Sequence, residues 1–264
     1  MLDVDLRDGV ATLTLDRPDV LNALDGALIT KLLETLGHVK ADPQARVLLL
    51  TGRGRGFCAG ADLRDDMMNL EQPPAERGRR FAESADAGVH ALVRALAGVG
   101  KPTVSAVNGI AAGGGASLAL TAHVVLAADS AYFQLPFTAQ LGLVPDMGGS
   151  WHLMRKLGPA RALPLVMLGE RLPARQAAEW GLVWKCLEDA ELQAAAREVA
   201  EKLARGAPRA LAMLPALMAG ALHHDLDSQL DRERDAQAAL VQTDDFVAAV
   251  QAFRAKRKPV FQGR

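Results

Sequence analysis

Two glycine-rich turns offer main-chain amides that could bind an oxygen atom gaining negative charge. The first, GRGRGFCAGADL, covers residues 52–63, and the second, NGIAAGGGASLAL, covers residues 108–120. Each follows an apolar run, and in the second turn three consecutive glycines open a short apolar helix. The first amides of a helix lack an internal acceptor and lie at the positive end of its dipole, so they suit a carbonyl oxygen that becomes anionic. A glycine-rich hairpin that only permits close packing is the alternative interpretation.

A carboxylate that could move a proton is Asp146, in the segment LGLVPDMGGSW at residues 141–151. An aspartate after a proline is also a common turn residue, so spacing alone leaves both roles open. In an apolar pocket the pKa of a carboxyl rises toward working pH, where it can accept and return a proton. Phe137, Leu141 and Trp151 are candidates to line such a pocket, although the sequence favours core packing for each.

The elements that must position these residues alternate between strands and helices. Two short runs around the pair Asp8 and Gly9 predict a hairpin, and Asp25 can cap a helix with a regular apolar face. Other apolar runs are unbroken and predict buried strands. Strand, loop and helix then repeat, which indicates a mixed α/β fold with parallel pairing. The expected strands are residues 2–6, 10–15, 47–51, 103–107, 124–128 and 182–186.

The helical pattern becomes denser toward the end of the chain. A shift in composition near Gly206 divides it into residues 1–205 and a more charged helical region, residues 206–264. The polar stretch at residues 64–80 predicts a lid or surface loop, and residues 131–151 predict an irregular segment before a helix opened by glycines. Further helices are expected at residues 75–98, 149–157, 159–168, 174–180, 188–205, 208–219, 223–241 and 244–256.

Composition excludes several classes of function. The 264 residues carry a formal net charge of −1, whereas a nucleic-acid binder would show a strong basic excess. We see no secretory signal and no apolar run long enough to span a membrane, so a cytoplasmic location is expected. Two distant cysteines, Cys58 and Cys186, predict reduced thiols, with Cys58 a small buried residue rather than a nucleophile. The six histidines show no zinc-like spacing, so no metal is expected.

Four segments in the same order resemble the crotonase, or enoyl-CoA hydratase/isomerase, superfamily. They are RGFCAGADL, NGIAAGGGASLAL, LGLVPDMGGSW and the tail FRAKRKPVFQGR, so the resemblance runs nearly end to end. It implies a crotonase-like spiral of ββα units in residues 1–205 and a helical trimerisation region in residues 206–264. It also implies a homotrimer or dimer of trimers that binds acyl-CoA thioesters, with no cofactor besides the coenzyme A of the substrate.

The resemblance assigns roles to individual residues. The amides of Ala61 and Gly114 would form the oxyanion hole. Hydratases of the family use two glutamates, but the corresponding positions are Ser117 and either Phe137 or Thr138, so efficient water addition is not expected. Asp146 matches the acid/base of ring-1,2-epoxyphenylacetyl-CoA isomerases and of some Δ3,Δ2-enoyl-CoA isomerases, for which a single carboxylate suffices.

Coenzyme A contacts follow from the same resemblance. Phe253 and Lys256 would approach the adenine from a neighbouring subunit, although Lys256 could equally be a solvated helix end. Arg17 could reach a phosphate or lie at the surface, and His123 replaces an aspartate of many relatives without an evident reason. The remaining substrate and coenzyme A contacts implied are Leu21, Ala23, Ala59, Asp62, Leu63, Gly113 and Phe137.

The sequence therefore predicts an acyl-CoA isomerase that converts ring-1,2-epoxyphenylacetyl-CoA to an oxepin, or shifts a Δ3 double bond to Δ2. The alternative is an enoyl-CoA hydratase of fatty acid oxidation. A further alternative uses Asp146 as the nucleophile of a dehalogenase, for which no histidine base is evident. An alternative of another class is a non-catalytic acyl-CoA binder or scaffold.

Overall fold

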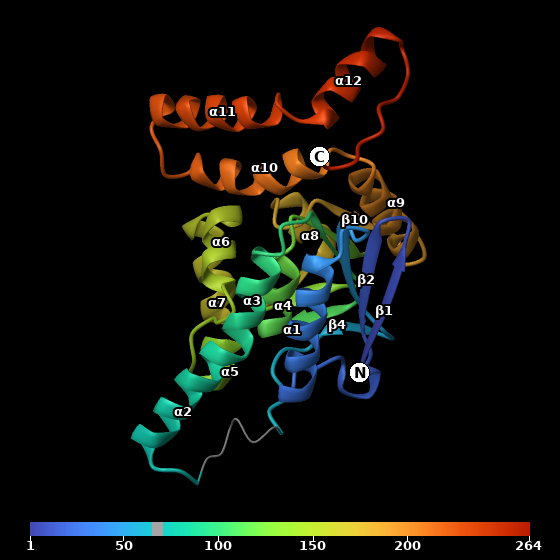
Figure 1. The fold of residues 1–264 in the computed structure, drawn as a ribbon. Helices are drawn as coiled ribbons and strands as arrows, with labels where there is room; N and C mark the ends of the chain where they lie inside the picture. Colours follow the sequence, from blue (N-terminus) through green and yellow to red (C-terminus); the bar gives the residue numbers. More distant parts are fainter. Residues whose placement is uncertain (65–70) are drawn as a thin grey trace.

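The computed structural model describes residues 1–64 and 71–264, and it arranges them as two sheets surrounded by helices (Figure 1). Residues 65–70, in the first half of the predicted lid, lie outside the described residues. A six-stranded sheet has the order β1-β2-β3-β5-β7-β10, and a four-stranded sheet has the order β4-β6-β8-β9. The first consists of Leu2–Arg7, Val10–Leu15, Val47–Gly52, Thr103–Val107, Val124–Ala128 and Lys185–Leu187, and the second of Gly56–Cys58, Ile110–Ala112, Tyr132–Gln134 and Arg171–Pro173.

In the middle of the sequence, successive strands from β3 to β8 alternate between the two sheets. β3, β5 and β7 pair in parallel in the larger sheet, and β4, β6 and β8 pair in parallel in the smaller one. Each pair of strands precedes a helical segment, so the chain advances as a spiral of ββα units, as expected. Every residue of β3 and β5 is buried, which explains their unbroken apolar runs.

The N-terminal predictions are confirmed in detail. β1 and β2 form an antiparallel hairpin with β1 at the edge of the sheet, and Asp8 and Gly9 have φ angles of 51° and 78°, as its two-residue turn requires. The Asp25 side chain accepts a hydrogen bond from the Leu28 amide at 2.8 Å and caps α1, Gly26–Ala41. The apolar face of α1 is buried against the core.

The helix predicted at residues 75–98 is wrong as one unit, because Gly88 divides it. α2, Pro74–Ala87, ends where the Gly88 amide donates to the Ser84 carbonyl, and α3, Val89–Ala97, begins after Gly88. Gly88 has φ −105° and ψ −96°, outside the helical region. The second half of the predicted lid is thus helical from Pro74.

Short elements account for the other differences. Residues 131–151 contain β8 and α5, Phe137–Leu141, in addition to α6, Gly149–Leu157. The predicted strand at residues 182–186 is shifted, because the residues that pair with β7 are Lys185–Leu187. The remaining helices are η1, Pro18–Val20; α4, Gly114–Leu120; α7, Pro159–Leu168; α8, Ala174–Glu179; and α9, Leu192–Ala204.

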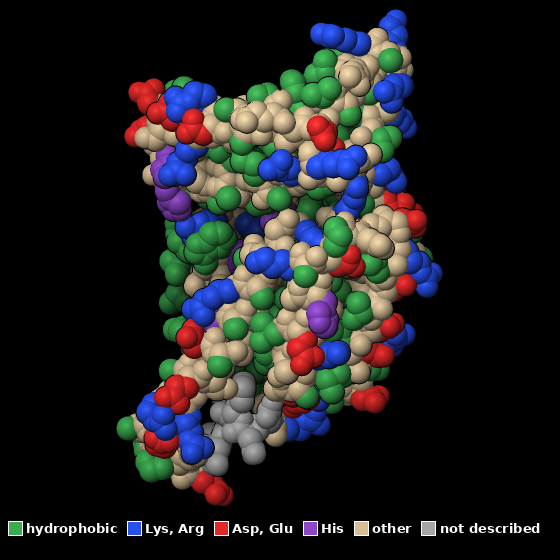
Figure 2. All heavy atoms as spheres, in the orientation of Figure 1, with side chains coloured by type: hydrophobic (Ala, Val, Ile, Leu, Met, Phe, Trp, Pro, Cys, Tyr) green, Lys and Arg blue, Asp and Glu red, His purple; other side chains and the backbone are tan. Residues whose placement is uncertain are grey.

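Three helices form a layer at one end of the molecule (Figure 1). They are α10, Pro208–Gly220; α11, Leu226–Leu240; and α12, Asp244–Arg254, and the predicted boundary at Gly206 falls between α9 and α10. Within the described residues, no helix combines the length and apolar character needed to cross a bilayer. Figure 2 shows acidic and basic side chains interspersed over the face in view.

Asp245 fastens the final residues to this layer. It is 5% exposed, and its carboxylate accepts hydrogen bonds from the Gln262 and Gly263 amides at 2.6 and 2.8 Å. Asp245→Ala should therefore lower the free energy of unfolding by about 1.5–3 kcal/mol, because hydrogen bonds to a charged group are lost. Denaturant unfolding would measure the change. Asp244→Ala is the matched control, since Asp244 is 80% exposed and lies 3.8 Å from Arg264; equal losses in both variants would contradict the prediction.

Candidate active site

A cavity of about 190 Å³ lies where the two glycine-rich turns meet α2, α3 and α5. Most of its lining is apolar, and among the described lining residues the ionisable side chain is that of Asp146. Such a cavity can keep a bound apolar group out of water and offers it, among the described residues, one carboxylate as a proton acceptor. The lining comprises Leu24, Ala59, Gly60, Ala61, Leu63, Phe81, Ala85, Val89, Gly113, Gly114, Pro136, Phe137, Gln140, Leu141, Leu143, Asp146 and Met147.

The two glycine-rich turns touch through their backbones. A Cβ at Gly60 would lie 2.8 Å from the Ala112 carbonyl oxygen and 3.1 Å from the Gly114 amide nitrogen, and Gly60 has a φ of +92°. Both constraints require glycine at this position. The absence of a side chain brings the loop that carries Ala61 onto the start of α4.

The amides of Ala61 and Gly114 are both available to a ligand. Ala61 forms a parallel bridge with Leu24, in which the Leu24 amide donates to Gly60 and the Leu24 carbonyl accepts from Asp62. That pattern leaves the Ala61 amide directed away from Leu24. Within the described residues, the Ala61 amide has no hydrogen-bond acceptor. Gly114 is the first residue of α4, so the helix supplies no acceptor for its amide. Both residues line the cavity, as a two-donor oxyanion hole requires.

Asp146 directs one carboxylate oxygen over Gly114. Its Oδ1 atom would lie 3.8 Å from a Cβ at Gly114, is buried, and has no hydrogen-bond partner in the described structure. Burial raises the pKa of Asp146 above its usual value, and the nearby His90 opposes this rise. A buried carboxylate oxygen without a hydrogen-bond partner is costly to the fold, which is typical of groups kept for chemistry.

The other candidates for the pocket separate into two groups. Phe137 is 7% exposed and its ring lies 3.6 Å from the position of a Cβ at Gly113, while Leu141 lines the rim and is 45% exposed. Trp151 is outside the described lining: it is 49% exposed, and the Arg155 guanidinium lies 4.0 Å from its ring centroid. Trp151 therefore does not line the pocket, and the core packing that the sequence favoured for it is also wrong, because α6 turns this face outward.

Comparison with known proteins identifies the fold and the family. The sequence matches the family described as "Enoyl-CoA hydratase/isomerase" over residues 5–264. The chain belongs to the enoyl-CoA hydratase/isomerase family. It is 44% identical to the 1,2-epoxyphenylacetyl-CoA isomerase of Escherichia coli K12, covering 97% of this chain and 96% of that protein. It is 34% identical to the carnitinyl-CoA dehydratase of Proteus mirabilis, covering 100% and 98%.

The solved structures agree with this membership. An enoyl-CoA hydratase from Bacillus anthracis superposes with a TM-score of 0.90 at 31% identity, covering 100% of this chain and 99% of that one. The spiral of ββα units is thus the crotonase fold of the enoyl-CoA hydratase/isomerase family.

The family's expected coenzyme A contacts lie in two places. Ala59, Leu63, Gly113 and Phe137 line the cavity, and Leu21 and Ala23 lie in the adjoining loop, where the Ala59 amide donates to the Leu21 carbonyl at 2.9 Å. Phe253 is 84% exposed at the end of α12, with Lys256 just beyond it. The contact of these last two residues with a neighbouring subunit stays a prediction.

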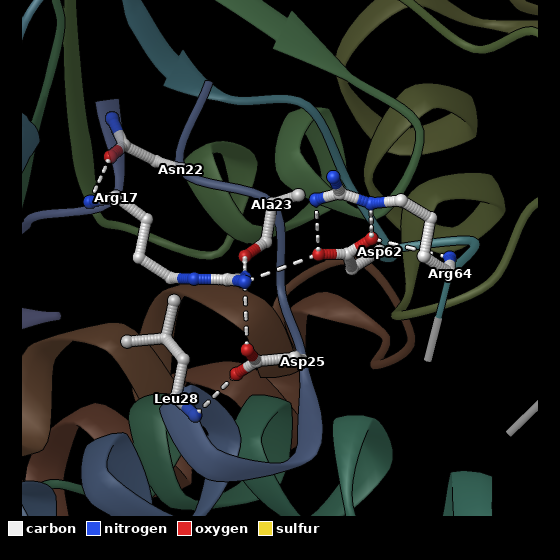
Figure 3. Close-up of polar contacts among 7 residues, drawn as sticks. All are labelled: Arg17, Asn22, Ala23, Asp25, Leu28, Asp62 and Arg64. Carbon is white, nitrogen blue, oxygen red and sulfur yellow. Dashed lines mark hydrogen bonds and ion pairs between the residues drawn. The ribbon is translucent and has the colours of Figure 1, made fainter. Parts of the chain in front are cut away.

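Arg17 joins the two loops that border the cavity (Figure 3). Its guanidinium donates to the Ala23 carbonyl and pairs with Asp25 at 2.8 Å and Asp62 at 3.2 Å. The side chain of Arg17 is 20% exposed, so the alternative of a surface arginine is wrong. Asp62 also receives two hydrogen bonds from the Arg64 guanidinium, at 3.0 and 3.1 Å, and the contacts with Arg64 and then Arg17 lower the pKa of Asp62.

Arg17→Met should loosen both loops. We expect a loss of about 1.5–3 kcal/mol in the free energy of unfolding and a raised KM for acyl-CoA, because charged hydrogen bonds hold the loop residues in place. Arg53→Met is the control, since Arg53 also pairs with two aspartates but is 50% exposed, which limits the expected loss to under about 1 kcal/mol. Chemical denaturation and steady-state kinetics would compare them, and similar losses in the two variants would contradict the role.

Two residues that shape the backbone of the site were not predicted from the sequence. Asn22 is fully buried with a φ of 58°, and its side chain accepts from the Arg17 amide and donates to the Arg53 and Gly56 carbonyls. Met147 is 2% exposed with a φ of 50°, next to Asp146. An asparagine in a loop is a weak signal for a left-handed backbone, and a methionine gives none.

The remaining polar candidates have structural explanations. The Nδ1 atom of His123 accepts a hydrogen bond from the Thr103 amide at 3.0 Å, which ties the end of α4 to β5. Cys58 is buried as predicted, and burial raises the pKa of its thiol to about 12. Across the described residues, no group of three or more His, Cys, Asp or Glu is placed to hold a metal ion.

Proposed function

We propose that this member of the family isomerises acyl-CoA thioesters. Asp146 removes a proton from the carbon next to the thioester carbonyl and returns it to another carbon of the acyl group. The Ala61 and Gly114 amides hold the thioester oxygen while it carries the negative charge of the enolate. Donors placed for the anion rather than for the neutral carbonyl lower the barrier, and one such donor is worth about 2.7–4 kcal/mol.

The observation that carries this proposal is that, among the described lining residues, Asp146 is the one carboxylate, with a buried oxygen that has no hydrogen-bond partner. Hydration needs an acid and a base on one water molecule, whereas isomerisation needs one group that can take and return a proton. Ser117, at the place of a hydratase glutamate, is fully buried and donates its hydroxyl proton to the Asp146 carbonyl. Phe137 and Thr138, the two candidates for the second glutamate position, have no carboxylate.

The apolar lining supports an uncharged acyl group as the substrate. We propose ring-1,2-epoxyphenylacetyl-CoA, rearranged to oxepin-CoA, or a Δ3-enoyl-CoA, shifted to its Δ2 isomer. The likeness to the Escherichia coli isomerase supports the former. The likeness to a hydratase and a dehydratase makes enoyl-CoA hydration the second candidate.

A panel of CoA thioesters tests the proposal. Epoxyphenylacetyl-CoA, Δ3-enoyl-CoA and Δ2-enoyl-CoA would be assayed in parallel, with products identified by mass spectrometry. We expect at least one isomerisation to exceed hydration by a factor of about 100, because a missing acid/base typically costs that much. Hydration faster than both isomerisations would favour the second candidate, and acyl-CoA binding without any turnover would favour a scaffold.

We also propose assembly as a homotrimer or a dimer of trimers. A groove of about 500 Å³ separates α10 from α11, and large apolar side chains of this layer are exposed. Sedimentation equilibrium should give three or six times 28.0 kDa, and a monomer would contradict the proposal. The exposed apolar side chains of the layer include Leu214, Met218, Leu222, Leu226, Leu230 and Phe253.

A cytoplasmic location stays a prediction.

A further inference from the structure

Ser117 is a buried hydroxyl that the proposed proton transfer does not use. It is 0% exposed, and its Oγ atom donates to the main-chain carbonyl of Asp146 at 3.0 Å. A buried hydroxyl is costly unless it is paired, so this contact is the reason why a serine is tolerated there. The contact reaches the backbone of the proton carrier rather than its carboxylate.

The carbonyl that accepts this hydrogen bond belongs to a strained turn. The Gly149 amide also donates to the Asp146 carbonyl, at 2.8 Å, across a turn in which Met147 and Gly148 have φ angles of 50° and 78°. A left-handed conformation costs a residue such as methionine about 1–2 kcal/mol. The turn therefore depends on its surroundings, and the carbonyl of Asp146 is fixed by two donors from different elements.

Packing leaves the turn little freedom beside Ser117. A Cβ at Gly149 would lie 2.6 Å from the Ser117 Oγ atom, and one at Gly114 would lie 2.6 Å from the Met147 sulfur. Gly114 and Ser117 belong to the same short helix, α4. One rigid element thus carries an oxyanion donor at its first residue and the hydroxyl that holds Asp146 one turn later.

We propose that Ser117 is a positioning residue for Asp146, which sets the direction of the carboxylate relative to the Gly114 amide. This inference rests on the proposed function, because it assumes that Asp146 carries the proton. Without the hydroxyl, the turn keeps one donor and the carboxylate can rotate toward solvent. The geometry of proton transfer would then be met less often, although the thioester would still bind.

Ser117→Ala and Ser105→Ala form a matched pair for the test. Ser105 is also 0% exposed, but its hydroxyl has no partner among the described residues and it lies on β5, outside the cavity lining. In Ser117→Ala we expect kcat to fall about tenfold with KM within twofold, because losing a hydrogen bond of about 1.4 kcal/mol would leave the productive orientation of Asp146 populated about one-tenth as often. Ser105→Ala should keep both constants. Ser117→Cys, a weak donor of similar shape, should resemble Ser117→Ala.

The titration of Asp146 provides a readout that does not need turnover. Carbon-13 NMR of labelled aspartate, with the Asp146 signal assigned from its loss in Asp146→Asn, reports its pKa in each variant. The pKa should be lower in Ser117→Ala, because the carboxylate becomes more solvated. His90 on α3 lowers the pKa of Asp146 electrostatically and is present in every variant, so its effect cancels in the comparison.

Three results would overturn the inference. They are an unchanged kcat in folded Ser117→Ala, an unchanged Asp146 titration in that variant, and an equal loss in Ser105→Ala. Thermal unfolding confirms that each variant is folded. The proposed function fails separately, if Asp146→Asn retains turnover. If Asp146→Asn is inactive and Ser117→Ala is fully active, only the role of Ser117 is contradicted.

Discussion

Asp146→Asn should lower isomerase turnover about a thousandfold while acyl-CoA still binds with nearly unchanged affinity. The substitution keeps the size of the side chain and removes the group that accepts the proton, and general acid/base catalysis is worth about 10²–10⁴-fold. Isothermal titration calorimetry with a CoA thioester would measure the affinity, and steady-state kinetics would measure turnover. Asp227→Asn, an exposed position in the first turn of α11, is the control.

The pH dependence of the wild-type enzyme tests the same group. Proton removal needs the carboxylate form, so activity should fall as pH drops through the pKa of Asp146, which burial holds above its usual value.

The stability of the folded chain also depends on the charge of Asp146, because burial disfavours the ionised carboxylate. Asp146→Asn should therefore unfold at a higher temperature than the wild type at pH 7. This gain should vanish below the pKa that Asp146 has in the unfolded chain, because its carboxyl group is then neutral in both the folded and the unfolded state. A destabilised variant at pH 7 would contradict the burial of the charge.

Gly115→Ala should strongly lower activity by displacing the backbone of the site. A Cβ at this position would lie 2.1 Å from the Cys58 carbonyl oxygen and 2.8 Å from the Cys58 side chain, which is fully buried. The strand and loop that lead to Ala61 would have to move away from α4. We expect the loss of one oxyanion donor, about 10²–10³-fold in kcat, and a loss of about 3 kcal/mol in stability from overpacking.

The same change at Gly37 provides the contrast. Gly37 lies inside α1, and a Cβ there would meet nothing within 4 Å. Gly37→Ala should raise the free energy of unfolding by about 0.5–1 kcal/mol, because alanine favours the helix, and should leave kcat unchanged. Urea titrations of both variants, with kinetics, would measure the difference. A fully active Gly115→Ala would show that the two turns need not touch.

Local chemistry explains which elements the sequence predicts well. The hairpin follows from Asp8 and Gly9, and the start of α1 from the side chain of Asp25, because both signals act within a few residues. The apolar strands β3 and β5 are equally clear, since both of their faces are covered. The proximity of Asp146 to Gly114 was expected only from the resemblance, because residues 32 positions apart in the sequence come together through tertiary packing.

The differences arise where tertiary contacts override local preference. β4 and β6 lie inside the glycine-rich segments and form because each pairs with a neighbouring strand, although glycine disfavours strands. The break at Gly88 is hidden, since residues on both sides favour a helix. The role of Ser117 could not be predicted, because it depends on a hydrogen bond to the Asp146 backbone.

The position of β1 at the edge of the larger sheet limits how molecules can join. Its outward residues include Asp3, Asp5 and Arg7, and Arg7 pairs with Asp5 at 2.9 Å. Docking a second β1 alongside would strip these charged side chains of water, which disfavours sheet extension between molecules through this strand. Ordered growth into fibrils through this strand is thereby discouraged.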